Sequence, residues 1–267
     1  MRSSILAFSI VLGACDAPHP GTPPAPVTPA PVTARSPSLE VGIGPEDPAA
    51  QAPSRRTGAF ANDDPADDLV VGPPDVVADC DEQLTRAGVG YRVATLPVHQ
   101  ERHSKIVCGA PQVVIYGRGP GGITYSPSPL LTCPMALALA SFEKVLQEEA
   151  TRTFHSAVVR IDQLGTYSCR EIIAFPGWVS EHSYANAIDL ARFTLKNGVT
   201  VDVQRDFDLG ADAPRRPAGA FLRAVSQRAY DEDIFSHVLT PFFNAAHRNH
   251  FHVDLARYRG DGTRPET

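Results

Sequence analysis

The sequence lacks the features expected of proteins that bind nucleic acids or span membranes. No long run of lysine or arginine occurs in its 267 residues, and the formal net charge is −6. This balance gives no electrostatic attraction to a polyanion, so we expect no nucleic-acid partner. Beyond the N-terminal segment, no apolar stretch is long enough to cross a bilayer. With 43% hydrophobic residues, the composition predicts one soluble domain joined to non-globular sequence.

Three familiar chemical motifs are also missing. No two cysteines have the CxxC spacing, which argues against a structural zinc site built from cysteines. Residues 117–122 are rich in glycine, but no Gly-Lys-Ser/Thr follows, so a loop is favoured over a phosphate cradle. Residues 165–169 lack the G-x-S-x-G elbow of serine hydrolases. None of these three chemistries is expected here.

The N-terminus resembles a bacterial export signal. Arg2 precedes a short apolar run, residues 5–12, which is too short for a transmembrane helix. The run leads into the sequence LGAC, which ends at Cys15 and is similar to the lipoprotein signal whose cysteine becomes lipidated. We therefore expect a signal peptide at 1–14 and a lipid on Cys15 that anchors the protein to a membrane of the cell envelope. A plain secretory signal with an incidental cysteine is the alternative.

Four cysteines remain after Cys15, and an even number in an exported protein predicts two disulfides. They are Cys80, Cys108, Cys133 and Cys169. Three pairings are possible and the sequence does not choose among them. As a guess we pair Cys80 with Cys108 and Cys133 with Cys169.

Residues 15–75 differ in composition from the rest of the chain. Fourteen of the 25 prolines lie between Pro18 and Pro74. Proline favours extended polyproline II structure, so this segment predicts a semi-rigid tether that holds a domain away from the membrane. A disordered tail of no selected length is the alternative. We expect the folded domain at 76–259 and a tail at 260–267.

Hydrophobic periodicity and turn residues predict an α+β domain, a largely antiparallel sheet with flanking helices. Pro134 suits a first helical position, and apolar residues recur from there at helical spacing. The sequence KNG at 196–198 predicts a hairpin turn. The expected helices are 80–87, 134–153 and 217–230; the expected strands are 91–94, 106–108, 113–116, 157–161, 187–195, 199–203, 235–239 and 250–255.

Three histidines lie within six residues near the C-terminus: His247, His250 and His252. In a strand, alternate side chains share a face, so His250, His252 and Asp254 are expected on one face. Two imidazoles on one face can divide the work of binding a metal ion and moving protons. A polar strand face with exposed histidines is the alternative. His155 and His237 are expected to be ordinary surface or core histidines.

A histidine and an aspartate seven positions apart complete the set of candidate metal ligands. His182 and Asp189 do not have the spacing of a helical HExxH motif, so we place them on a loop that feeds a strand. Asp189 stands in an apolar run, where a carboxylate is costly to bury unless it is paired or bound to a metal. A salt bridge to an arginine is the alternative. Catalytic zinc has about three protein ligands, which two histidines and one aspartate can supply.

These motifs resemble known families. The run from Ser180 to Asp189, SEHSYANAID, resembles the S-x-H-x-x-G-x-A-x-D motif of the D-alanyl-D-alanine metallopeptidases, with Ala185 where the motif has glycine. His250-Phe-His252 resembles the H-x-H motif of the wider group that includes lysostaphin, those peptidases and hedgehog. The longer stretch HRNHFHV is similar to that of the penicillin-insensitive murein endopeptidase.

Over a longer span, the chain resembles the bacterial extensin-like C-terminal family. This resemblance covers about residues 79–255. It rests on the sequences TCPMA at 132–136, GTYSCR at 165–170, FLRAV at 221–225, VLTP at 238–241 and NAAH at 244–247, together with the motif at 180–189.

The resemblance implies a role for each polar residue. Zinc would be held by His182, Asp189 and His252. His250 would act as general base, taking a proton and passing it to the leaving amine. His247 would bind a substrate group or support the base. Arg170 would face the substrate or the developing oxyanion, a structural ion pair being the alternative.

The function implied is that of an exported, lipid-anchored zinc metallopeptidase that hydrolyses peptide bonds of peptidoglycan. Its partners would be peptidoglycan peptides. The alternative is a non-catalytic, zinc-containing lipoprotein that binds the cell wall. A metal-free structural domain is a third possibility.

Overall fold

The computed structural model describes residues 72–172, 175–210 and 213–265. The expected signal peptide, Cys15 and nearly all of the expected tether lie outside these residues. Among the described helices, none is long and apolar enough to cross a membrane.

One large mixed sheet dominates the fold, in the order β1-β2-β3-β5-β8-β11-β10-β12, with β4 paired to β2 and β9 to β8. Most neighbours are antiparallel; β3–β5 and β10–β12 are parallel. The strands are β1 (Gly90–Gln100), β2 (Val107–Arg118), β3 (Thr124–Ser126), β4 (Leu130–Thr132), β5 (Val158–Gln163), β8 (Ala187–Leu195), β9 (Thr200–Asp202), β10 (His237–Leu239), β11 (Phe251–Asp254) and β12 (Gly260–Gly262). The prediction of an α+β fold with a largely antiparallel sheet is confirmed.

The three helices that the sequence predicts are present, together with a short helix at 203–206 that was not predicted. The described residues contain four α-helices: α1 (Cys80–Arg86), α2 (Cys133–Phe154), α3 (Val203–Asp206) and α4 (Pro217–Asp231). Helix α2 begins after Thr132, whose hydroxyl accepts a hydrogen bond from the Met135 backbone N–H, with proline at the first turn. Its stripe of Met135, Leu139, Phe142 and Leu146 is fully buried.

Several strand boundaries differ from the expectation. The two short strands expected at 106–108 and 113–116 are one strand, β2. The expected hairpin at 196–198 joins β8 to β9, and its Gly198 has φ +87, which glycine adopts without a steric penalty. A separate two-stranded ribbon, β6 (Glu171–Ile172) and β7 (Phe175–Val179), was not predicted. Strand β12 lies within residues 260–267, where we expected a tail.

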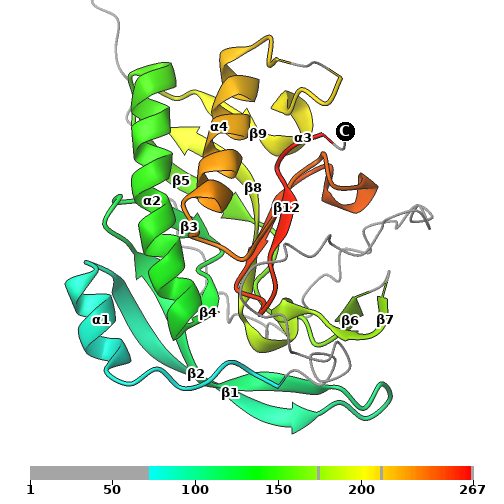
Figure 1. Ribbon diagram of the computed structural model, residues 1–267. Helices are drawn as coiled ribbons and strands as arrows, with labels where there is room; N and C mark the ends of the chain where they lie inside the picture. The colour runs from blue at the N-terminus through cyan, green and yellow to red at the C-terminus, as the bar shows by residue number, and fades with distance from the viewer. Residues whose placement is uncertain (1–71, 173–174, 211–212, 266–267) are drawn as a thin grey trace, which may run out of the picture. The chain divides into compact units, whose positions relative to one another are not determined.

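Helices α2 and α4 pack side by side on one face of the sheet (Figure 1). The rings of Phe154 and Phe221 join these two helices at a centroid distance of 5.4 Å. Phe251 and Val253 of β11 join the same core. Because side chains alternate along a strand, the residue between them, His252, points to the opposite face of the sheet.

The structure contains two disulfides, as expected, but their pairing differs from our guess. Cys80 pairs with Cys133, and Cys108 pairs with Cys169, with Cα–Cα distances of 6.1 and 5.6 Å. The guess joined cysteines that follow each other along the chain. Instead, α1 packs against the start of α2, and β2 lies beside the loop before β6. Two disulfides indicate an oxidising, extracytoplasmic compartment.

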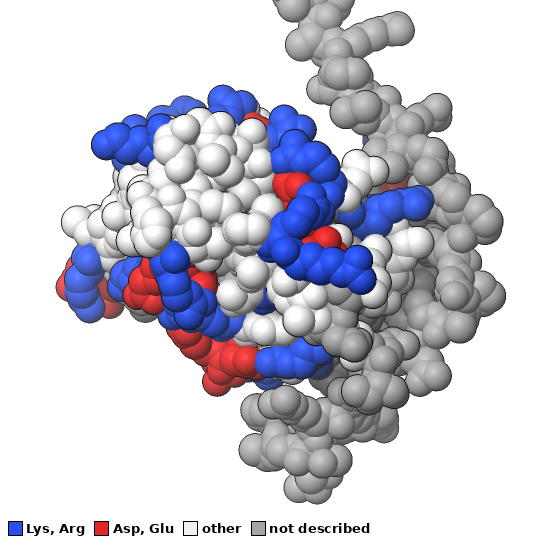
Figure 2. Space-filling view, turned by 90° about the horizontal axis from the view of Figure 1, so that it is seen from above, with Lys and Arg blue, Asp and Glu red and all other residues white. Residues whose placement is uncertain are grey.

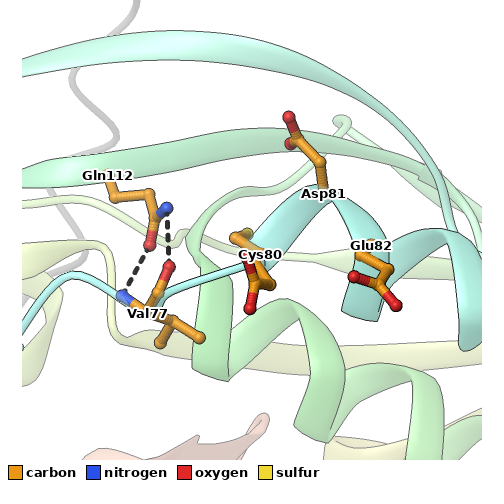
Figure 3. Close-up of a pocket in the computed structure, with 6 residues that line it drawn as sticks. Val77, Cys80, Asp81, Glu82 and Gln112 are labelled. Carbon is orange, nitrogen blue, oxygen red and sulfur yellow. Dashed lines mark hydrogen bonds between the residues drawn. The ribbon is translucent and has the colours of Figure 1, made fainter.

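A hollow of about 390 Å³ lies beside the start of α1, next to β2 (Figure 3). Several of its polar groups already have partners. Val77 N–H donates to Gln112 Oε1 and Gln112 Nε2 donates to the Val77 carbonyl, at 3.0 and 3.2 Å. Asp81 accepts a hydrogen bond from the Tyr91 hydroxyl, and Cys80 is in a disulfide. We therefore assign no ligand to this hollow.

Basic and acidic side chains are mixed on the face where α2 ends and α4 begins (Figure 2). Several of them form ion pairs there, such as Arg216 with Asp206 and Arg205 with Asp206. The lysines and arginines border a broad uncharged area in this view. This face therefore has no continuous field of one sign.

Candidate metal centre

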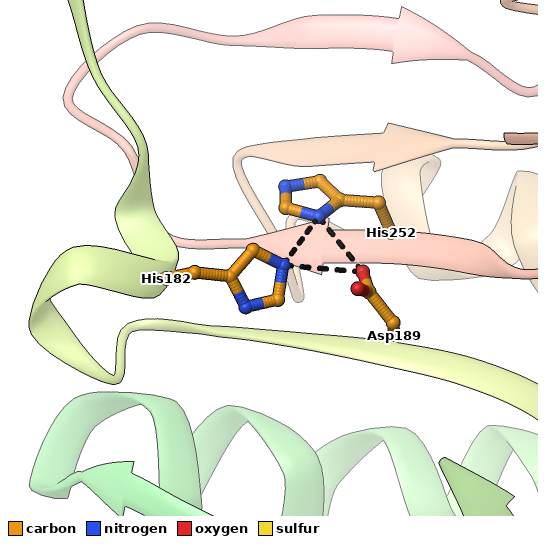
Figure 4. A group of neighbouring side chains, drawn as sticks. All are labelled: His182, Asp189 and His252. Carbon is orange, nitrogen blue, oxygen red and sulfur yellow. Dashed lines mark hydrogen bonds and ion pairs between the residues drawn. The ribbon is translucent and has the colours of Figure 1, made fainter. Parts of the chain in front are cut away.

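Three different elements bring the expected metal ligands together (Figure 4). Asp189 lies on β8 and His252 on β11, directly opposite each other in the antiparallel register. His182 lies on the 3-10 helix η2 (Glu181–Tyr184), which precedes β8. The chain passes from η2 directly into β8, and this short connection accounts for the seven-residue spacing of His182 and Asp189. These three residues form a group that could hold a metal ion.

One atom from each residue points to a common centre. His182 Nε2 lies 3.2 Å from Asp189 Oδ1 and 3.1 Å from His252 Nδ1, and the last two atoms are 3.0 Å apart. The side chains of His182, His252 and Asp189 are only 3%, 12% and 17% exposed. Such a concentration of acceptor atoms is stable only with a proton or a cation between them.

The two flanking histidines keep Asp189 ionised. Burial raises the pKa of Asp189, but the charges and hydrogen bonds of His182 and His252 hold it well below its usual range. For His252, burial lowers the pKa, but the hydrogen bonds with Asp189 and Asp254 outweigh burial and raise it to about 10. Asp189 therefore stays ionised, which suits a cation.

A buried pair lies behind His252. Its Nε2 is 2.9 Å from Asp254 Oδ2, and Asp254 Oδ1 is 2.8 Å from His237 Nδ1. We expected His237 to be an ordinary histidine, but it contacts the carboxylate that contacts the metal-ligand group. The face shared by His252 and Asp254 was predicted; the pairing of β10, which sets His237 opposite Asp254, was not.

His250 lies at the edge of the centre. Its Nε2 is 3.5 Å from Asp189 Oδ1, and its Nδ1 is 2.7 Å from Asn249 Oδ1. Because an amide oxygen only accepts, Nδ1 carries the proton and Nε2 presents its lone pair to the centre. Burial lowers the pKa of His250, the charge of Asp189 raises it in part, and the net shift is downward. His250 is therefore a neutral proton acceptor.

His247 lies beside His250, with ring centroids 5.3 Å apart. Its Nδ1 is 2.7 Å from Asn244 Oδ1, which also accepts the backbone N–H of Ala246 and of His247 at the start of η3 (Ala245–His247). These two backbone donors identify the Asn244 atom as oxygen, so His247 Nε2 is left unprotonated. Burial holds the pKa of His247 well below its usual range.

Arg170 is exposed, close to these two histidines. Its positive charge contributes to lowering the pKa of both His247 and His250. Its backbone is fixed to η2, because Arg170 N–H donates to Ser183 Oγ at 3.0 Å and its carbonyl accepts from Ser180 N–H at 3.1 Å. Within the part of the chain that the structure describes, Arg170 forms no ion pair with an acidic side chain.

Ala185 stands where the peptidase motif has glycine, and the structure explains the motif. Ala185 follows η2 with φ 55, in the left-handed region where a side chain costs about 1–2 kcal/mol. Glycine avoids this cost. The methyl group of Ala185 is fully buried with Ala110 and Val113, and this burial offsets part of the strain.

Comparisons with known proteins identify the family. No curated protein and no solved structure matches the chain. One protein family does match, over residues 78–264, which is well over half of the chain and includes every residue of the centre. The chain belongs to the family described as "Extensin-like protein C-terminus".

Proposed function

We propose that this protein is an exported zinc metallopeptidase that hydrolyses peptide bonds of peptidoglycan. One observation carries the proposal. His182 Nε2, Asp189 Oδ1 and His252 Nδ1 converge within 3.2 Å of one another, and the unprotonated Nε2 of His250 faces the same centre at 3.5 Å from Asp189.

The three ligand atoms suit zinc. Zinc–ligand bonds of about 2.0–2.1 Å at tetrahedral angles separate the ligand atoms by about 3.3 Å. The observed separations of 3.0 to 3.2 Å are close to that value. Two imidazoles and a carboxylate are also the ligand types that catalytic zinc sites use.

A zinc ion in this centre would polarise the carbonyl of the scissile bond and make water a stronger nucleophile. His250 Nε2 would accept the proton released during attack and deliver it to the leaving amine. Its hydrogen bond to Asn249 orients the ring for both steps. Arg170 and His247 would bind the substrate beside the base, Arg170 by facing the developing negative charge.

The choice of peptidoglycan rests on the resemblance of the motifs. The 180–189 and 247–253 segments resemble those of D-alanyl-D-alanine metallopeptidases and of the penicillin-insensitive murein endopeptidase. The two disulfides agree with an extracytoplasmic site of action. We also propose that residues 1–14 are a signal peptide, that Cys15 carries the lipid, and that residues 15–75 reach from the membrane toward the wall.

The alternative is a non-catalytic lipoprotein that binds the wall, with a structural zinc ion. A structural site has four protein ligands, whereas a catalytic site leaves one position for water. The group that could hold the metal contains three residues and does not include His247. Three protein ligands leave one position for water, so the number of ligands favours a catalytic site over a structural one.

The test combines metal analysis with digestion of purified peptidoglycan. We would compare the wild-type protein with His250→Ala, His182→Ala and His103→Ala, the last an exposed histidine outside the centre. We expect one zinc per chain and released muropeptides, identified by mass spectrometry, from the wild type and His103→Ala. His250→Ala should retain zinc but release nothing.

Two results would contradict the proposal. Hydrolysis by metal-free His182→Ala would exclude the zinc mechanism. Zinc bound to the wild type without any released product would support the wall-binding alternative.

A further inference from the structure

We propose that Asp254 and His237 form a positioning dyad that fixes the orientation and tautomer of His252, so that its Nδ1 is presented to the metal ion. This inference rests on the proposed function, because it concerns the same centre. Neither residue reaches the common centre itself, so both act through His252.

The carboxylate of Asp254 determines which nitrogen of His252 is free. Asp254 is 4% exposed, and its Oδ2 lies 2.9 Å from His252 Nε2. A carboxylate only accepts hydrogen bonds, so Nε2 of His252 carries a proton. A histidine that binds a metal ion must be neutral, and the lone pair of the ring is then on Nδ1, the atom that faces His182 and Asp189.

His237 in turn holds Asp254. Its Nδ1 donates to Asp254 Oδ1 at 2.8 Å, and the same oxygen accepts the backbone N–H of Ala256 at 3.0 Å. Both oxygens of the carboxylate therefore have fixed donors, and its plane cannot turn without losing them. The two histidines contact different oxygens of one carboxylate, and these contacts connect β10 through Asp254 of β11 to the centre.

The ring of His237 is closely packed. Strand β12 places Gly260 opposite His237, and a Cβ atom at Gly260 would lie 2.2 Å from His237 Cδ2. The Tyr258 ring packs in a T-shaped arrangement with the same imidazole, with ring centroids 4.6 Å apart. The backbone of Gly260 and the ring of Tyr258 thus restrict the imidazole of His237, which orients Asp254.

Burying a carboxylate and an imidazole is not needed for packing alone. An apolar pair of similar volume would fill the space without the cost of desolvating Asp254. A carboxylate that accepts the second N–H of a metal-binding histidine is the usual way to fix such a ligand, and removing it lowers metal affinity by about 10–100-fold.

The experiment measures zinc affinity by competition with a chromophoric chelator, and the absorption spectrum of the Co²⁺ form, in the purified full chain. We expect Asp254→Asn to lower zinc affinity by about 10–100-fold and to change the Co²⁺ spectrum. His237→Ala should lower affinity less. His237→Asn, whose amide can still donate to Asp254, should restore most of it.

Glu143→Gln is the matched control, because Glu143 is another fully buried carboxylate whose hydrogen-bond partners lie outside the centre. It should bind zinc as the wild type does. Wild-type affinity and an unchanged Co²⁺ spectrum in folded Asp254→Asn and His237→Ala would overturn the dyad. A wild type that binds zinc without hydrolysis would overturn only the peptidase, and one that binds no metal would overturn both.

Discussion

Asp189 shows why a charged residue stands in the apolar run of β8. Its neighbours Ile188 and Leu190 are fully buried in the main core, while Asp189 points to the other face. The basic side chains within 3.5 Å of its Oδ1 among the described residues are those of His182, His250 and His252, and none is an arginine. The expected alternative, a salt bridge to arginine, therefore has no support there.

Glu143 is a buried carboxylate that joins elements of the fold. It is fully buried on α2 and accepts hydrogen bonds from the hydroxyls of Tyr116 and Tyr125 and from Gly121 N–H, at 2.9, 3.0 and 2.7 Å. These bonds join α2 to β2, to β3 and to the turn between them. Burial raises the pKa of Glu143, and the three hydrogen bonds oppose the rise.

This raised pKa predicts a pH-dependent effect of Glu143→Gln. A group whose folded-state pKa is raised stabilises the fold most below its unfolded pKa, and this stabilisation is lost as the pH rises through the folded value. We expect the variant to be less stable than the wild type by about 1–3 kcal/mol, because the amide has one accepting oxygen where the carboxylate uses two. The difference should be larger at pH 5 than at pH 7.

Urea unfolding at both pH values measures this difference. A loss of stability that is equal at the two pH values, or larger at pH 7, would contradict the assignment.

At the scale of elements, the loop at 164–170 supports both the η2 and β8 ligands. Ser168 N–H donates to the His182 carbonyl at 3.0 Å. Leu164 N–H donates to the Asp189 carbonyl, and Asp189 N–H donates to the Gly165 carbonyl, at 2.9 and 3.1 Å. The Cys108–Cys169 disulfide fixes the end of this loop to β2.

The two disulfides therefore predict different effects on metal binding. The Cys80–Cys133 and Cys108–Cys169 bonds close loops of similar length, with separations of 53 and 61 residues. Replacing either pair by alanine should lower the free energy of unfolding by about 2–4 kcal/mol. Only loss of Cys108–Cys169 should also weaken zinc binding, because only this bond supports the loop that holds His182.

Calorimetric titration of zinc into the two double variants, each checked for folding by circular dichroism, separates these effects. Equal weakening of zinc binding in both variants would show that general loss of stability, rather than the loop, is responsible.

At the scale of the whole molecule, the centre connects distant parts of the chain. His182 and His252 are 70 residues apart and meet within 3.1 Å. A metal ion bound by both must favour the folded state, because the unfolded chain does not hold these ligands together.

Zinc should therefore stabilise the protein. At a free zinc concentration 100 times the dissociation constant, binding adds about 2.7 kcal/mol to the free energy of unfolding. Thermal unfolding with zinc and with a chelator checks this. His103→Ala should respond as the wild type does, and His182→Ala should show no shift; a shift of wild-type size in His182→Ala would mean that zinc binds elsewhere.

The residues of the centre and most of the elements were predictable because their signals are local. Helical spacing identified α2, alternation placed His252 and Asp254 on one face, and a carboxylate in an apolar run marked Asp189. The short strands β3, β4 and β12 were not predicted, because each contains too few residues to show a hydrophobic periodicity. They exist through their hydrogen bonds to neighbouring strands.

By itself, the sequence determined the α+β class, the number of disulfides and the three residues that could hold a metal. Only the tertiary structure decided which cysteines pair, the order of the strands and the contact of His237 with Asp254. These features depend on contacts between residues far apart in the chain. The free energies of these contacts depend on how whole elements pack, and a local pattern of residues does not predict that packing.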